Sequence, residues 1–134
     1  MKKGLLILVT VSSVLVIGLL TNFYINDISL FREEEMVRAL PIFRNTSKVG
    51  SFTTTWPDSN PGSGLAYHTD ALPVEIFDFY EKALNGSGWS LENRTEPSGL
   101  ESQGGIRYKR DKYWLQISVR GQKSPFTVTL LVQR

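Results

Sequence analysis

The residues of this chain that could do acid–base chemistry are few, and they gather around one histidine. His68 is the only histidine, and Asp70 follows it two positions later. On an extended segment residues i and i+2 point to the same side, so the imidazole and the carboxylate could come into contact. Such a pair acts as a general base only beside a nucleophile or a poised substrate. The nearby serines lie in loops without a nucleophile-elbow motif, so the sequence predicts no catalytic residues, and an extracytoplasmic hydrolase is kept only as an alternative.

Metal and cofactor chemistry have as little support in the sequence. The chain has no cysteine, which removes thiolate zinc sites, iron–sulfur clusters and cysteine nucleophiles together. One imidazole with scattered carboxylates matches no recognised metal-ligand spacing. The glycines of 61–64 and of 104–105 form neither a Walker A loop nor a dinucleotide-binding fingerprint, so they predict turns. We therefore expect no cofactor and no bound metal.

A run of basic residues between positions 107 and 123 carries a stronger binding signal. Strand alternation places Arg107, Lys109 and Arg120 on one outward face, together with Trp114 and Gln116. This face could bind anionic lipid headgroups, an acidic protein or a wall polymer, whereas the alternative is a solvated face whose charges discourage edge-to-edge aggregation. The formal net charge of +2 is too small to predict nucleic-acid binding. The residues expected to contact an anionic surface are Arg107, Lys109, Arg120, Lys112, Lys123 and Trp114.

A helix and a set of strands must position these side chains. Residues 73–85 predict an amphipathic helix that begins at a proline and ends before two glycines. Its apolar face is expected to hold Ile76, Phe77, Tyr80, Ala83 and Leu84.

Alternating apolar and polar residues after this helix predict four strands, at 89–94, 106–110, 113–120 and 126–133. Before the helix, the pattern predicts a strand at 48–56, a loop at 57–64 and a short extended segment at 65–69. Short connections favour an antiparallel meander. The predicted fold class is therefore α+β, with one amphipathic helix packed on a meander sheet of about five strands.

The helix and the strand after it also carry a resemblance. The pattern Phe77-x2-Tyr80-x3-Leu84-x3-Gly88-Trp89, followed by basic and aromatic strands, resembles a class of small, mostly uncharacterised prokaryotic membrane-anchored or secreted proteins. The resemblance covers about residues 41–134. It implies the same helix followed by an antiparallel meander, and it implies no catalytic residues.

The N-terminal segment predicts where the protein resides. Residues 4–25 contain no charged side chain, and about 20 apolar residues suffice to span a bilayer as a helix. We expect residues 1–25 to be an uncleaved transmembrane anchor, because the apolar run is too long for a signal peptide and ends without a small-x-small cleavage site. Lys2 and Lys3 precede it, which favours a cytoplasmic N-terminus.

The rest of the chain divides into two expected parts. Residues 26–40 predict a helix that either continues the anchor as a stalk or packs on the domain or on another membrane protein, and residues 41–134 predict one extracytoplasmic α+β domain. We therefore expect a single-pass cell-membrane protein that acts by binding or as an accessory subunit. The alternative is a sensor of membrane surfaces or anionic polymers that uses the basic face.

Overall fold

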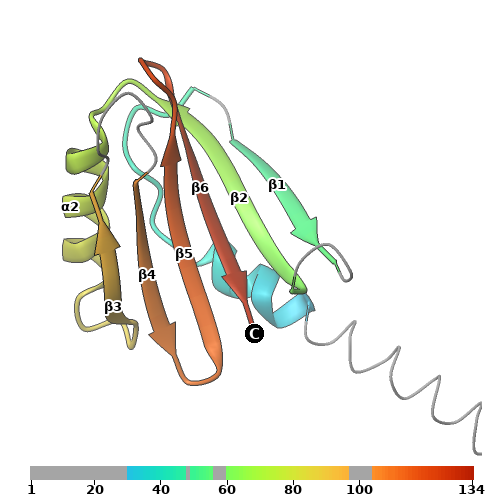
Figure 1. The fold of residues 1–134 in the computed structure, drawn as a ribbon. Coiled ribbons are helices and arrows are strands. Elements are labelled where there is room, and N and C mark those ends of the chain that lie inside the picture. The colour runs from blue at the N-terminus through green and yellow to red at the C-terminus, as the bar shows by residue number, and fades with distance from the viewer. Residues whose placement is uncertain (1–29, 48, 56–59, 97–103) are drawn as a thin grey trace, which may run out of the picture. The chain divides into compact units, whose positions relative to one another are not determined.

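The protein, seen here as a computed structural model, is described over residues 30–47, 49–55, 60–96 and 104–134. Its centre is a six-stranded antiparallel sheet with the strand order β1-β2-β6-β5-β4-β3 (Figure 1). The labelled elements are β1 (Val49–Thr54), β2 (Gly62–Thr69), α2 (Pro73–Leu84), β3 (Ser90–Thr95), β4 (Gly104–Arg110), β5 (Tyr113–Arg120) and β6 (Phe126–Gln133). A further helix covers residues 30–38. The predicted α+β class is confirmed.

The sheet contains one strand more than the sequence predicted. The segment 57–64 was expected to be a loop, but β2 begins at Gly62 and pairs with β1 on one side and β6 on the other. Glycine has low strand propensity, yet tertiary pairing overrides it here. A side chain at Gly64 would lie 2.2 Å from the Phe52 ring, so only glycine leaves room for that ring. The loop prediction was wrong for 62–64, because the need for glycine there comes from a neighbouring strand, while residues 57–59 lie outside the described residues.

The connectivity of the sheet also differs in one place from a simple meander. Strands β3 to β6 follow one another as predicted, each pairing with the next. The hairpin of β1 and β2 is added beyond β6, so β2 pairs with β6 and not with β3, the strand that follows it in the chain. The chain returns from β2 to the far edge of the sheet through α2 (Figure 1).

One face of the sheet forms the core, and we call it the inner face. Its side chains alternate as predicted along β5 and β6, where Leu115, Ile117 and Leu130 are fully buried. The other face is called the outer face below. The remaining buried apolar residues of the inner face are Tyr67, Ile106, Tyr108, Tyr113, Val119, Phe126, Val128 and Val132.

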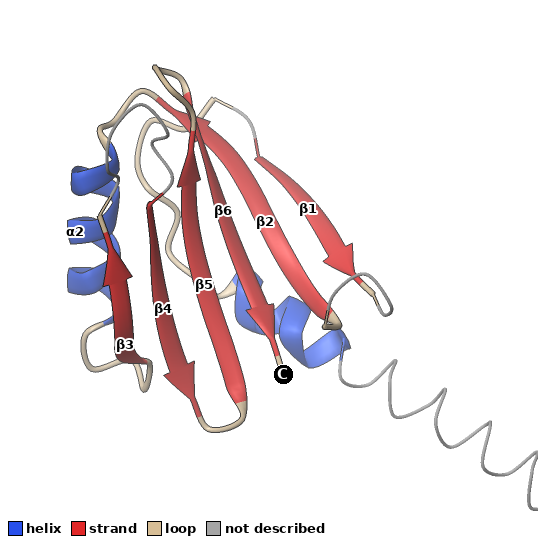
Figure 2. Ribbon diagram, in the orientation of Figure 1, coloured by secondary structure: helices blue, strands red, loops and turns tan. Residues whose placement is uncertain are grey.

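Both helices cover the inner face (Figure 2). From α2, Ile76, Phe77 and Tyr80 are fully buried, but Ala83 is exposed, against the prediction. Glu75 accepts a hydrogen bond from the Leu72 backbone amide at 2.8 Å, which occupies one of the unpaired N–H groups at the start of the helix.

The helix at residues 30–38 reaches the same core. Glu33–Arg134 forms one compact unit, and within it Val37 and Leu40 are buried among the core residues. Of the expected helix at 26–40, the part from Glu33 to Leu40 therefore packs on the domain, while residues 26–29 lie outside the described residues. The segment after them continues the cover, since the Phe43 ring meets the Phe79 ring edge-on at 5.2 Å.

The predicted anchor at residues 1–25 lies outside the described residues, so it stays a prediction. Within the described part of the chain, no helix has the length and apolar character needed to cross a membrane.

Candidate anion-binding face

No helix of the described residues covers the outer face of the sheet, and the polar side chains of this face come from alternate positions of the strands. On β4 these positions are Lys109, Arg107 and Gly105, opposite Trp114, Gln116 and Ser118 of β5. Arg120, one step further along β5, is opposite Thr127 of β6. The strand alternation thus places Arg107, Lys109 and Arg120 on the same face, as their spacing suggested.

Two of these cations gather over one indole ring. The Arg107 guanidinium carbon lies 5.9 Å and the Lys109 ammonium nitrogen 4.8 Å from the centre of the Trp114 ring. Arg107 also donates a hydrogen bond to Gln116 through Nη2, at 3.2 Å. Both cations are exposed, while Trp114 is half-buried. The indole and the amide hold two positive charges in place at the surface without neutralising them.

The outer face carries no acidic side chain at its paired positions. Every outward residue in the register of the six strands is basic, neutral or apolar, and Glu92 falls in the irregularity between Leu91 and Asn93. No ion pair joins Arg107, Lys109 or Arg120 to a carboxylate of the described residues. Their charges are therefore uncompensated within this part of the protein.

Arg94 on β3 shows the opposite arrangement. It points to the α2 side of the sheet, where Nη1 lies 3.0 Å from Asp78 and 2.7 Å from Glu81, and Nε pairs with Glu96. Hydrogen bonds to Glu81 and the other two carboxylates raise the pKa of this guanidinium further. Arg94 ties β3 to α2, so its role is structural, in contrast to the cations of the outer face.

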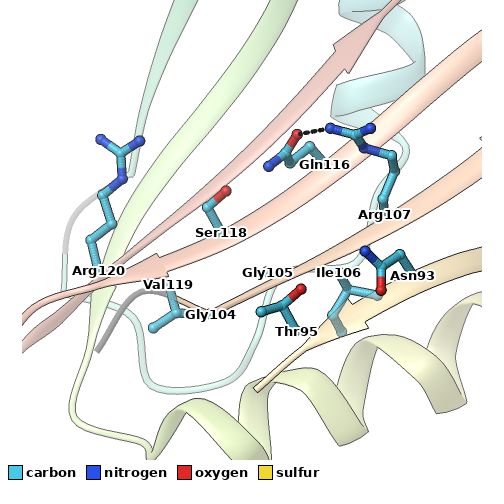
Figure 3. Close-up of a pocket in the computed structure, with 10 residues that line it drawn as sticks. All are labelled: Asn93, Thr95, Gly104, Gly105, Ile106, Arg107, Gln116, Ser118, Val119 and Arg120. Atoms are coloured by element: carbon cyan, nitrogen blue, oxygen red, sulfur yellow. Dashed lines mark hydrogen bonds between the residues drawn. The ribbon is translucent and has the colours of Figure 1, made fainter. Parts of the chain in front are cut away.

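A cavity of about 330 Å³ opens on the outer face over β3, β4 and β5 (Figure 3). Arg107 and Arg120 stand at its two ends, and Asn93 and Thr95 border it from β3. The cavity is deepest in its middle, where Gly105 has no side chain. The lining is completed by Gly104, Ile106, Gln116, Ser118 and Val119.

The two remaining basic residues of the sequence prediction do not join this face. Lys112 lies in the turn between β4 and β5, with its ammonium nitrogen 5.6 Å from the centre of the inward-facing Tyr113 ring. Lys123 is exposed in the loop between β5 and β6. Of the predicted set, Arg107, Lys109 and Trp114 form one cluster, and Arg120 lies across the cavity from Arg107.

Two lining residues from β3 were missed by sequence reasoning. Simple alternation from Leu91 predicts that Asn93 points inward. The strand shifts register between these residues, so that Leu91 is opposite Tyr108 while Asn93 is opposite Arg107. The irregularity turns Asn93 and Thr95 to the outer face. No local sequence signal marks such a shift, because it depends on the pairing with β4.

The contact between His68 and Asp70 that the sequence left possible is not formed, since each side chain has another partner. His68 Nδ1 lies 3.2 Å from the Thr127 hydroxyl, and Asp70 accepts a hydrogen bond from Ser124. The serine hydroxyl thus contacts the carboxylate, not the imidazole, and the contact between nucleophile and base that a hydrolase needs is missing from this cluster. Among the described residues, no group of three His, Asp or Glu side chains could hold a metal ion.

The core itself contains several buried polar groups. The Tyr67 and Tyr80 hydroxyls are 2.9 Å apart, and burial raises the pKa of both, so the pair is neutral. Burial also raises the pKa of Tyr108 to about 12, and its hydroxyl has no hydrogen-bond partner within the described ranges. Glu33 is only 1% exposed, and in the part of the chain that the structure describes neither of its carboxylate oxygens has a hydrogen-bond partner.

Comparison of the chain with protein-family models, with curated proteins and with solved structures gave no match. The resemblance drawn from Phe77, Tyr80, Leu84 and Trp89 therefore stays a prediction, and the functional argument depends on the site.

Proposed function

We propose that this protein is a membrane-tethered binding module that holds an anionic polymer against the outer face of its sheet. The proposal rests on one observation: the outer face carries three exposed cations and no acidic residue at its paired strand positions. The cations are Arg107, Lys109 and Arg120. Such a face attracts and orients a polyanion. The tether is the apolar segment at 4–25, and the domain lies outside the cytoplasm.

A polymer fits this face better than a lipid surface does. Interfacial binding to lipid uses exposed apolar and aromatic side chains together with basic ones. In the described part of 33–134, the exposed large apolar residues all lie away from the outer face, at Ile42, Leu72, Val74 and Leu91. Arg107 and Arg120 instead line a cavity together with the amide and hydroxyl groups of Asn93, Thr95, Gln116 and Ser118. These groups suit a polar chain that lies across the strands.

The test compares two triple variants of the full-length chain in a non-ionic detergent. One variant, R107Q/K109Q/R120Q, removes the outer-face charges. Its control, R32Q/R44Q/K82Q, removes three exposed charges that lie on no strand. The ligand is polygalacturonate, and its dissociation constant is measured at low and at high salt.

Exposed charge pairs contribute about 0.2–1 kcal/mol each, so the loss of three should weaken binding by about 3- to 150-fold. The control should change affinity less than threefold, and high salt should weaken the unaltered protein towards the outer-face variant. Equal losses in both variants would show that the affinity follows net charge alone. Binding to nanodiscs of anionic lipid that polygalacturonate does not compete with would favour a membrane surface instead and contradict the proposal.

A further inference from the structure

We infer that the cavity over β3, β4 and β5 receives one acidic sugar or polyol unit of the polymer, with its carboxylate or phosphate between Arg107 and Arg120. This inference rests on the proposed function and names its ligand class. The unit would be recognised by its acid group and by its hydroxyl groups together, which distinguishes it from a polyanion that has no hydroxyls.

The shape of the cavity is set by two small residues in register. Gly105 of β4 is opposite Ser118 of β5, and both face outward. A side chain at Gly105 would lie 3.3 Å from the Ile117 carbonyl oxygen and 4.0 Å from Gln116 Nε2, in the space that is now open. The resulting hollow of about 330 Å³ is at the lower end of the range for small-molecule sites, which suits a single unit of a polymer.

The charges at the two ends select an anion. A guanidinium group can donate two parallel hydrogen bonds to a carboxylate or a phosphate. Arg107 is held at one end by its hydrogen bond to Gln116, and Arg120 stands at the other end (Figure 3). Neither pairs with a carboxylate of the described residues, and none of the described residues that line the cavity is acidic. An anionic group in the cavity would therefore have a guanidinium group at either end and no like charge among these lining residues.

The remaining side chains select hydroxyl groups. Thr95 and Ser118 offer hydroxyls, and Asn93 offers an amide, all of which both donate and accept hydrogen bonds. The two apolar lining residues, Ile106 and Val119, turn their side chains to the inner face and are buried there. The cavity thus has little apolar surface for an aromatic or aliphatic ligand.

The irregularity in β3 supports this assignment independently. Without the shift between Leu91 and Asn93, Asn93 and Thr95 would point to the core side and the hollow would have no polar border at β3. Irregularities of this kind often redirect side chains next to functional sites.

The experiment measures three polyanions against the full-length chain in a non-ionic detergent. Trigalacturonate carries carboxylates and hydroxyls, poly(glycerol phosphate) carries phosphates and hydroxyls, and polyglutamate carries carboxylates alone. The lining variant is T95A/S118A, and its matched control is T53A/T129A, which removes two hydroxyls from strand positions outside the cavity. Circular dichroism establishes that both variants are folded.

We expect the lining variant to bind trigalacturonate or poly(glycerol phosphate) about tenfold more weakly, from two lost hydrogen bonds. The better of these two ligands tells a carboxylate source from a phosphate source. Polyglutamate binding should change less than twofold in both variants. Equal weakening for polyglutamate, or no weakening for either hydroxyl-bearing ligand, would overturn the inference while leaving the proposed function intact. Failure of all three polyanions to bind would overturn both. A measurement without variants adds a check, because free galacturonate should displace trigalacturonate at lower concentration than glutarate does.

Discussion

Replacing Glu33 should make the protein more stable, although the residue is buried. The residue is 1% exposed, and neither of its carboxylate oxygens has a hydrogen-bond partner among the described residues. Burial raises its pKa above the ordinary value of 4.5 and outweighs the lowering effect of the positive charges on Arg134 and Lys112. A polar group buried without a partner costs about 1–3 kcal/mol. Glu33→Met keeps a long unbranched side chain, so it should raise the free energy of unfolding at neutral pH by about that amount.

The pH dependence follows from the direction of the pKa shift. Because the folded pKa lies above the unfolded value, the carboxyl is protonated in both states below about pH 4.5 and then costs no charge burial. As the pH rises through the folded pKa, the wild-type protein loses stability that Glu33→Gln retains. The stability difference between Glu33→Gln and wild type should therefore be small at pH 4 and grow towards neutrality.

The assay is thermal unfolding of the full-length chain, followed by near-UV circular dichroism from pH 4 to pH 8. For a unit of about 100 residues, each 1 kcal/mol moves the midpoint by about 4–8 °C. Glu35→Gln serves as the control, because Glu35 is exposed on the same helix and should change stability by less than about 0.5 kcal/mol. A lower midpoint for Glu33→Met at pH 7, or a Glu33→Gln effect that does not change with pH, would refute the reasoning.

Three further predictions test other parts of the structure. Arg94→Gln breaks the contacts to Asp78 and Glu81, so it should lower the free energy of unfolding by about 1–2 kcal/mol at low salt. Urea titrations should show a smaller loss at high salt, because salt screens ion pairs. Equal losses at low and high salt would contradict the ion-pair account. Gly64→Ala places a methyl group against the Phe52 ring, so it should lower the free energy of unfolding by about 1 kcal/mol. The loss should be measurable as faster amide hydrogen exchange in β1, and it should disappear in a Phe52→Ala background. The mature chain should stay in the membrane fraction with its first residues present; N-terminal sequencing that begins near residue 25 would disprove the anchor.

The inner face of the sheet was largely predictable, because burial on one side of a strand leaves a period of two in the sequence. Leu115, Ile117 and Leu130 follow that period and are fully buried. The helix at 73–84 was found for the same reason, through the spacing of Ile76 and Tyr80. Ala83 of the same helix was wrongly assigned to the apolar face, since it is exposed. A small residue at the edge of that face adds little to the apolar pattern.

The features that could not be predicted from the sequence depend on contacts between distant segments. The first half of β2 contains glycine because Phe52 of the neighbouring strand needs the space, and nothing local marks that need. The outward position of Asn93 comes from a register shift against β4. For the candidate site, alternation sufficed to group Arg107, Lys109 and Trp114, but not to show that Gly105 opens a cavity between two arginines.

The most direct test of the account asks which face of the protein a polyanion covers. Arginine side chains of the full-length chain are modified with a dicarbonyl reagent, with and without polygalacturonate, and the extent of modification is read by mass spectrometry. The account predicts that Arg107 and Arg120 are protected, whereas Arg44, which is exposed but lies outside the sheet, reacts equally in both conditions. Equal protection of all three, or protection of Arg44 alone, would contradict the assignment of the outer face as the binding surface.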